Sequence, residues 1–150
     1  MIQRIQTLYL LVVVALGVAL IWLPVVQFVT QEDSLQMQLW ELNALGGVPI
    51  QGIWGLTLTT VLIPLLALVD IFLYKKRLLQ ARLNIFTVML CLGYYGVLAL
   101  YIWPAKMTLD AEWYILPWAS IPLVCMVLTL MATRRILKDE ALVRAADRIR

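Results

Sequence analysis

Four long apolar stretches, separated by shorter polar segments, dominate the pattern along the chain. They occupy about 19–22 residues each, close to the roughly 20 that a helix needs to cross the hydrocarbon core of a bilayer. Asp70 is the only charged residue within them. Because the backbone must satisfy its own hydrogen bonds in hydrocarbon, we expect helices. The pattern predicts an all-α membrane protein: one four-pass transmembrane domain over residues 1–150, a four-helix bundle with helices at about residues 8–29, 53–74, 85–103 and 113–131.

The polar segments between the apolar stretches carry two further signals. Residues 35–39 alternate apolar and polar side chains, which is the period of a strand. Residues 106–109 could supply a partner strand, so we expect a small extracytoplasmic hairpin or sheet. The tail, residues 134–150, is rich in helix formers, and Glu140 and Arg144 are spaced to interact on one helix face. We therefore predict a cytoplasmic C-terminal helix.

Composition agrees with a membrane location, and the charges orient the chain. The sequence is 63% hydrophobic and only 14% charged, against about 25% charged in soluble domains. The N-terminal segment, the middle loop and the tail lie on one side of a four-pass protein. They carry every Lys and Arg except Lys106, so the positive-inside rule places both termini in the cytoplasm. The interfacial aromatic belt predicted on the opposite side consists of Trp22, Trp54, Trp103, Trp113 and Trp118.

The two ends of the chain resemble a known family. The opening residues 1–9 (MIQRIQTLY) and the closing residues 138–150 (KDEALVRAADRIR) are similar to those of small four-helix membrane proteins from Bacteroidetes-type bacteria. That family is catalogued only as a domain of unknown function. The resemblance spans the whole chain and implies a location in the bacterial inner membrane. It implies no activity and no catalytic residues.

Asp70 is the first candidate for chemistry, because an ionisable group inside a membrane segment is expensive and often functional. One interpretation is a proton or cation site. The other is a structural partner of Lys75, Lys76 or Arg77, or a carboxylate that reaches water. We favour the structural interpretation, since Asp70 lies about one turn from the cytoplasmic end of its predicted helix.

The other candidates also have a structural and a functional interpretation. Gly93, Tyr94, Tyr95 and Gly96 could line a pocket for a quinone, but we favour a packing notch with tyrosine hydroxyls bonded across helices. Cys91 and Cys125 could be neighbours on adjacent helices. Without histidine or a third thiol they make an incomplete metal site, so we expect free thiols that behave as small hydrophobes, and no metal or cofactor.

Two classes of function remain. The first is a non-catalytic accessory or scaffolding subunit of a larger membrane assembly, bound to protein partners and to lipid but not to nucleic acid. Its predicted contact surface is the mixed-charge tail: Lys138, Asp139, Glu140, Arg144, Asp147 and Arg148. The alternative is a small transporter or a lipid- or quinone-binding protein that uses Asp70, Tyr94 and Tyr95. No residues nominate an enzyme.

Overall fold

Most of the chain is helical. The computed structural model describes residues 3–29, 34–37, 41–43, 49–74, 76–109 and 112–148. The long helices are α1 (Gln3–Trp22), α2 (Trp54–Phe72), α3 (Arg77–Leu109) and α4 (Ile121–Arg148), and a short 3₁₀ helix, η1 (Pro117–Ser120), precedes α4. Four helices of the described chain are long and apolar enough to cross a membrane.

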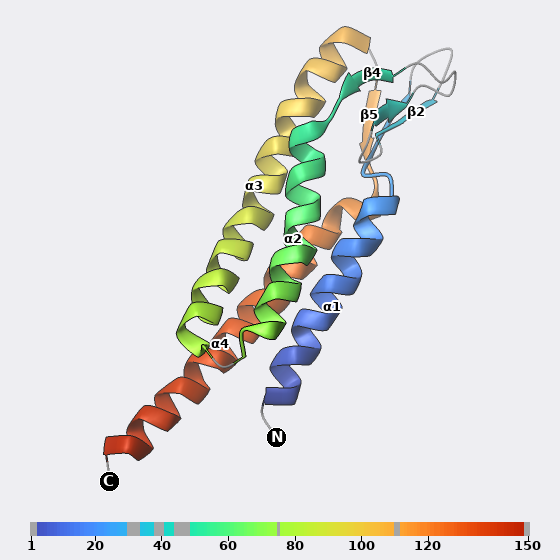
Figure 1. Cartoon of the computed structure of the whole chain (residues 1–150). Helices are drawn as coiled ribbons and strands as arrows, with labels where there is room; N and C mark the ends of the chain where they lie inside the picture. Colours follow the sequence, from blue (N-terminus) through green and yellow to red (C-terminus); the bar gives the residue numbers. More distant parts are fainter. Residues whose placement is uncertain are drawn as a thin grey trace.

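The helices form an antiparallel bundle in which each packs against two neighbours. Helix α1 contacts α2 and α4, and α3 contacts the same two helices (Figure 1). A sheet covers one end, which we call the sheet end. At the opposite end, the tail end, α1 begins, α2 turns into α3, and α4 continues past the other helices (Figure 1).

The buried positions of the helices recur at alternating intervals of three and four residues. This spacing is typical of the seam between helices that cross at a shallow angle. On α1 the seam runs through Gln6, Leu10, Val13, Gly17 and Leu20, and on α2 through Leu56, Thr60, Ile63, Ala67 and Asp70. On α3 it includes Gln80, Asn84, Thr87, Cys91, Tyr94 and Leu98, and on α4 Cys125, Thr129, Ala132 and Ile136.

Helices α1 and α2 approach each other closely at Gly17. A Cβ atom added there would lie 2.9 Å from the Cβ of Pro64, so only glycine fits. The packing notch predicted at Gly93 and Gly96 is wrong, because an added Cβ at either residue would meet nothing within 4 Å.

The sheet has five short antiparallel strands in the order β4-β3-β2-β1-β5. They are β1 (Val26–Val29), β2 (Ser34–Met37), β3 (Glu41–Asn43), β4 (Pro49–Gly52) and β5 (Glu112–Ile115). Strand β1 pairs with β2 on one side and with β5, far away in sequence, on the other. Thus the chain between α1 and α2 and the chain between α3 and α4 meet in one sheet.

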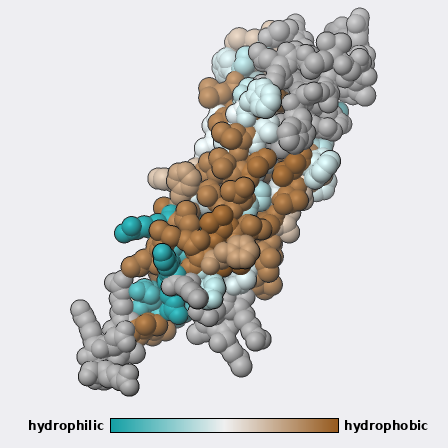
Figure 2. Space-filling view, viewed as in Figure 1, coloured by the Kyte–Doolittle hydropathy of each residue, from teal (hydrophilic) through white to brown (hydrophobic). Residues whose placement is uncertain are grey.

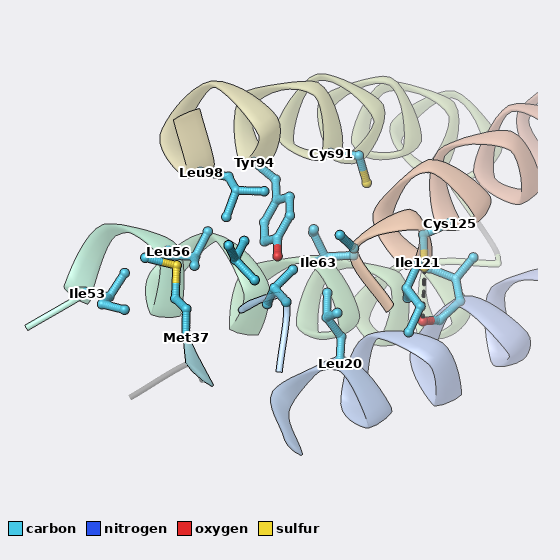
Figure 3. Close-up of a cluster of buried hydrophobic side chains, with 14 of the residues drawn as sticks. Leu20, Met37, Ile53, Leu56, Ile63, Cys91, Tyr94, Leu98, Ile121 and Cys125 are labelled. Atoms are coloured by element: carbon cyan, nitrogen blue, oxygen red, sulfur yellow. Dashed lines mark hydrogen bonds between the residues drawn. The ribbon is translucent and has the colours of Figure 1, made fainter. Parts of the chain in front are cut away.

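One face of the sheet closes the helical core. Val26 and Phe28 of β1 and Met37 of β2 are buried in the same cluster as Ile53 and Leu56 at the start of α2. Figure 3 shows Met37 beside Ile53 and Leu56. The sheet is therefore packed onto the bundle and does not stand apart from it.

Several predicted boundaries differ from the structure. Helix α1 ends at Trp22, because Pro24 cannot donate a helical hydrogen bond and the following residues 26–29 form a strand. Trp113 lies in β5, so the last long helix begins at Ile121. The strand expected at residues 106–109 is wrong. Those residues extend α3 to Leu109, and β5 is the strand that pairs with β1. Strand β2 confirms the strand predicted from residue 35 as far as Met37; residues 38 and 39 lie outside the described residues.

Candidate functional site

A polar cluster lies inside the tail end of the bundle. Asp70 of α2 and Asn84 of α3 are each only 1% exposed, and Gln80, one turn before Asn84, is also buried. The Nε2 group of Gln80 donates a hydrogen bond of 3.2 Å to the backbone carbonyl of Asp70, which ties the end of α2 to the start of α3. All three residues occupy inward-facing positions of the helical seams.

Several buried polar atoms of this cluster lack a hydrogen-bond partner. Within the described part of the chain, neither carboxylate oxygen of Asp70 has a hydrogen-bond partner, and neither does Nδ2 of Asn84. The Asn84 amide neighbours the Asp70 carboxylate, but these groups do not reach hydrogen-bond geometry. A buried polar group without a partner is costly, so this arrangement is unusual for a purely structural core.

The predicted pairing of Asp70 with Lys76 or Arg77 is wrong, and so is the predicted exposure to water. Arg77 is seven residues beyond Asp70, which would place it on the same face of a continuous helix. Helix α2 ends at Phe72, however, and a turn separates the two residues. The Lys76 side chain is exposed, while Asp70 points into the bundle. Lys75 lies outside the described residues.

The buried threonines, by contrast, satisfy themselves. The hydroxyl groups of Thr60, Thr87, Thr129 and Thr133 each donate to the backbone carbonyl four residues earlier, at 2.7–3.0 Å. This hydrogen bond within the helix is common for threonine, and it means that these hydroxyl groups need no acceptor on a neighbouring helix. Among the described residues, the buried side-chain atoms at this end that lack a hydrogen-bond partner therefore belong to Asp70 and Asn84.

The base of the C-terminal tail is held by the chain itself. Nε2 of Gln6 on α1 donates a hydrogen bond of 2.7 Å to Oδ2 of Asp139. Glu140 lines a cavity of about 530 Å³ that it shares with Lys76, Arg77 and Arg82 at the start of α3. Among the other residues of the predicted contact tail, Lys138 is exposed, and the side chains of Arg144, Asp147 and Arg148 lie outside the described part.

A second cavity, of about 420 Å³, opens on the other side of Arg77. Its lining combines apolar side chains of α1 and α2 with polar groups that include Gln6, Tyr74 and Gln80. Asp70 lines neither of these two cavities. Arg77 borders both.

The two central tyrosines differ although they are adjacent. The Tyr95 hydroxyl donates to the carbonyl of Ala119 at 2.9 Å and accepts from the N–H of Leu123 at 3.1 Å, so it bonds across helices as expected. The Tyr94 hydroxyl is buried and has no partner among the described residues. Figure 3 shows its ring directed from α3 into an aliphatic cluster that includes Ile63.

Both cysteines are buried and free. The thiol of Cys125 lies 3.9 Å from the carbonyl of Val13, the contact dashed in Figure 3. Among the described residues, no three Cys, Asp or Glu side chains gather as they would around a metal ion.

The five tryptophans of the predicted belt are all exposed, and all lie towards the sheet end: near the ends of α1 and α3, at the start of α2, in β5 and in η1.

The family comparison covers almost the whole chain. Residues 2–149 match the family described as Domain of unknown function (DUF4293). The chain belongs to this family. The predicted resemblance to a family of unknown function is thereby confirmed. A search of the curated proteins found no match.

For this DUF4293 chain, the sequence analysis did not predict that Gln80 and Asn84 lie next to Asp70. It began the third helix at residue 85, because Arg77 and Arg82 interrupt the apolar run, and so placed Gln80 and Asn84 in or beside a loop. One signal could have found them. Gln80, Asn84 and Thr87 follow the same alternating spacing as Cys91 and Tyr94, so the inward face of α3 extends two turns further than its apolar residues indicate.

Proposed function

We propose that this protein is an integral membrane protein that crosses the bacterial inner membrane four times, with both termini in the cytoplasm. The main support for this proposal is the apolar exterior of the bundle. Large apolar side chains such as Leu58, Met89 and Leu100 are more than 60% exposed, and they continue over all four helices. Figure 2 shows the hydrophobic band between the two ends. In water such a surface would be strongly unfavourable, whereas lipid would cover it.

The two ends of the bundle support this orientation. Exposed indole rings gather at the sheet end, and the basic residues Lys76, Arg77, Arg82, Arg134 and Arg135 lie towards the tail end. Indoles favour a membrane interface, and basic residues are retained on the cytoplasmic side. The sheet then faces away from the cytoplasm.

Site-directed labelling tests this topology. In a variant whose buried cysteines are replaced by alanine, Glu112→Cys in β5 should react with an impermeant thiol reagent added to intact spheroplasts. Lys138→Cys should react only after the membrane is opened. Both side chains are exposed, so burial does not protect either one. The reverse pattern would overturn the orientation, and release of the protein by alkaline carbonate would overturn the membrane location.

Within that membrane, the protein acts as a non-catalytic accessory or scaffolding subunit of a larger assembly. The single observation that supports this role is the course of α4, which continues past the rest of the bundle (Figure 1). Leu142 and Val143 are 57% and 44% exposed on this extension, next to charged residues. An exposed helix that mixes apolar and charged side chains suits a protein partner, which would bury the apolar groups and align the charges.

Substitutions on this extension test the role. The double variant Leu142→Ser/Val143→Ser should lose proteins that copurify with the wild type in mild detergent. Ala141→Ser, an exposed position on the same turn, should retain them. The thermal midpoint should remain close to wild type in both variants, because none of the three side chains is buried. If the double variant keeps the same partners, the tail is not their contact surface.

Asp70 supports a second candidate function, a membrane site for a proton or small cation. Its carboxylate is buried without a hydrogen-bond partner in the described structure. Ionisable groups in such places commonly mark proton or ion pathways. This candidate ranks second because Asp70 lines neither cavity at the tail end.

Flux measurements distinguish the second candidate from the first. In liposomes that contain the purified protein and an internal pH dye, wild type should dissipate a proton gradient faster than Asp70→Asn. Asp139→Asn should match wild type, because Asp139 lies on the tail and is bonded to Gln6. Equal rates for wild type and Asp70→Asn would exclude proton transport through this site.

A further inference from the structure

The cavity between the start of α3 and the base of the tail brings positive charge next to apolar surface. Lys76, Arg77 and Arg82 line it together with Glu140, so three positive charges face one negative charge. Leu78 and Leu79 lie in the same wall.

We propose that this cavity binds the phosphate headgroup of an anionic phospholipid. The inference rests on the proposed membrane location and adds a ligand to it. Arginine offers a planar fork of N–H donors that matches phosphate oxygens, and Arg77 and Arg82 supply two such forks. Arg77, Leu78 and Leu79 of the first turn of α3 also line the cavity, and the helix dipole favours an anion near a helix N-terminus.

The surface that leads away from the cavity identifies a lipid as the source of the phosphate. Leu78, Arg82, Ile85, Met89 and Leu92 are all exposed and recur every three or four residues, so they share one face of α3. From Ile85 to Leu92 this face is entirely apolar. A headgroup held at Lys76 and Arg82 would therefore direct its acyl chains along Ile85 and Met89, where a soluble phosphate has nothing to contact.

The hydropathy surface agrees with this arrangement. Figure 2 shows hydrophilic side chains at the tail end beside the hydrophobic band. Basic pockets in such positions on the cytoplasmic side of membrane helices are suited to anionic headgroups. Glu140 of α4 lowers the net positive charge of the cavity.

Native mass spectrometry of the full-length protein in detergent tests the proposal. Wild type should retain added phosphatidylglycerol in preference to phosphatidylcholine. Lys76→Gln/Arg82→Gln should weaken phosphatidylglycerol binding by about tenfold or more, since each basic residue near a headgroup contributes to the attraction. Both side chains are exposed, so the variant should fold; an unchanged thermal midpoint checks this.

Matched controls separate a site from general attraction to charge. Arg135→Gln removes an exposed cation from α4 that does not line the cavity, and Lys106→Gln removes one near the other end of α3. Both should bind phosphatidylglycerol as wild type does. Equal weakening by Arg135→Gln, or no weakening by the double variant, would overturn the proposal.

A competition experiment separates the lipid from a soluble phosphate. Inorganic phosphate, compared with chloride at equal ionic strength, should fail to displace phosphatidylglycerol. Displacement by phosphate would assign the cavity to a soluble anion and overturn the lipid assignment. These outcomes differ from failure of the membrane proposal, which the carbonate extraction and thiol labelling measure without added lipid.

Discussion

The two ends of the helical core are filled with different side chains. Towards the sheet, the core consists of aliphatic and aromatic groups, among them Phe28, Met37 and Leu56, and the sheet closes it. Towards the tail, the same seams carry Asp70 and Asn84, whose polar atoms lack partners among the described residues. The helices are continuous through both regions, so the packing geometry is shared and only the chemistry changes.

This difference separates stability from function. Apolar burial and close packing at the sheet end stabilise the fold and need no ligand. At the tail end, a buried carboxylate without a partner lowers stability, and proteins retain such groups chiefly where they serve a purpose. Both cavities that border Arg77 also lie at the tail end. The surfaces that we propose to be functional therefore lie at the tail end, and the sheet end stabilises the bundle.

The largest change in the free energy of unfolding should come from a substitution that creates a cavity in the core near the sheet. Leu56→Ala removes a side chain that is 0% exposed, and it should lower the free energy of unfolding by about 2–5 kcal/mol. Leu58→Ala, two residues away and 62% exposed, is the control and should change it little. Thermal unfolding in detergent measures both. Equal losses would show that the exposed face of α2 is packed against something in the native protein.

The contact between α1 and α2 should be nearly as sensitive. Gly17→Leu forces a side chain against Pro64, and overpacking of this kind costs about 1–3 kcal/mol or more. Gly93→Leu, where an added Cβ meets nothing within 4 Å, should be tolerated. The thermal midpoint and the retention of a single peak in size-exclusion chromatography report the outcome. A tolerated Gly17→Leu would contradict the close approach of these helices.

The sequence predicts the helices well, and it predicts contacts between distant segments poorly at both ends. The four helices can be predicted because long apolar runs are visible in the local sequence. The positions of the tryptophans within these runs likewise predict that their indole rings lie at one end of the bundle. The pairing of β1 with β5 joins segments more than 80 residues apart, and no local pattern specifies such a partner. The burial of Asp70 without a basic partner depends on the end of α2 at Phe72, because a helix that continued for five more residues would have included Arg77.

The chemistry at the tail end should be visible in the stability of an Asp70 variant. Asp70→Asn keeps the shape of the side chain and removes a negative charge that has no hydrogen-bond partner in the described structure. We expect the free energy of unfolding to rise by about 1–3 kcal/mol. Asp139→Asn is the control, and it should lose some stability because a neutral amide oxygen accepts the hydrogen bond from Gln6 more weakly than the Asp139 carboxylate does. Loss of stability in Asp70→Asn at neutral pH would show that the carboxylate has a stabilising partner.

The smallest effect should distinguish the two adjacent tyrosines, which lie between the two ends. Tyr95→Phe removes a hydroxyl that bonds to both Ala119 and Leu123, and it should lower stability by about 1 kcal/mol. Tyr94→Phe removes a buried hydroxyl without a partner among the described residues, so it should leave stability unchanged or slightly raised. The rings pack edge to face at 5.5 Å, and both variants retain that contact, so the comparison isolates the hydroxyl groups. If Tyr94→Phe proves as harmful as Tyr95→Phe, the Tyr94 hydroxyl has a partner in the native membrane. The apolar region would then extend less far from the sheet than the packing indicates.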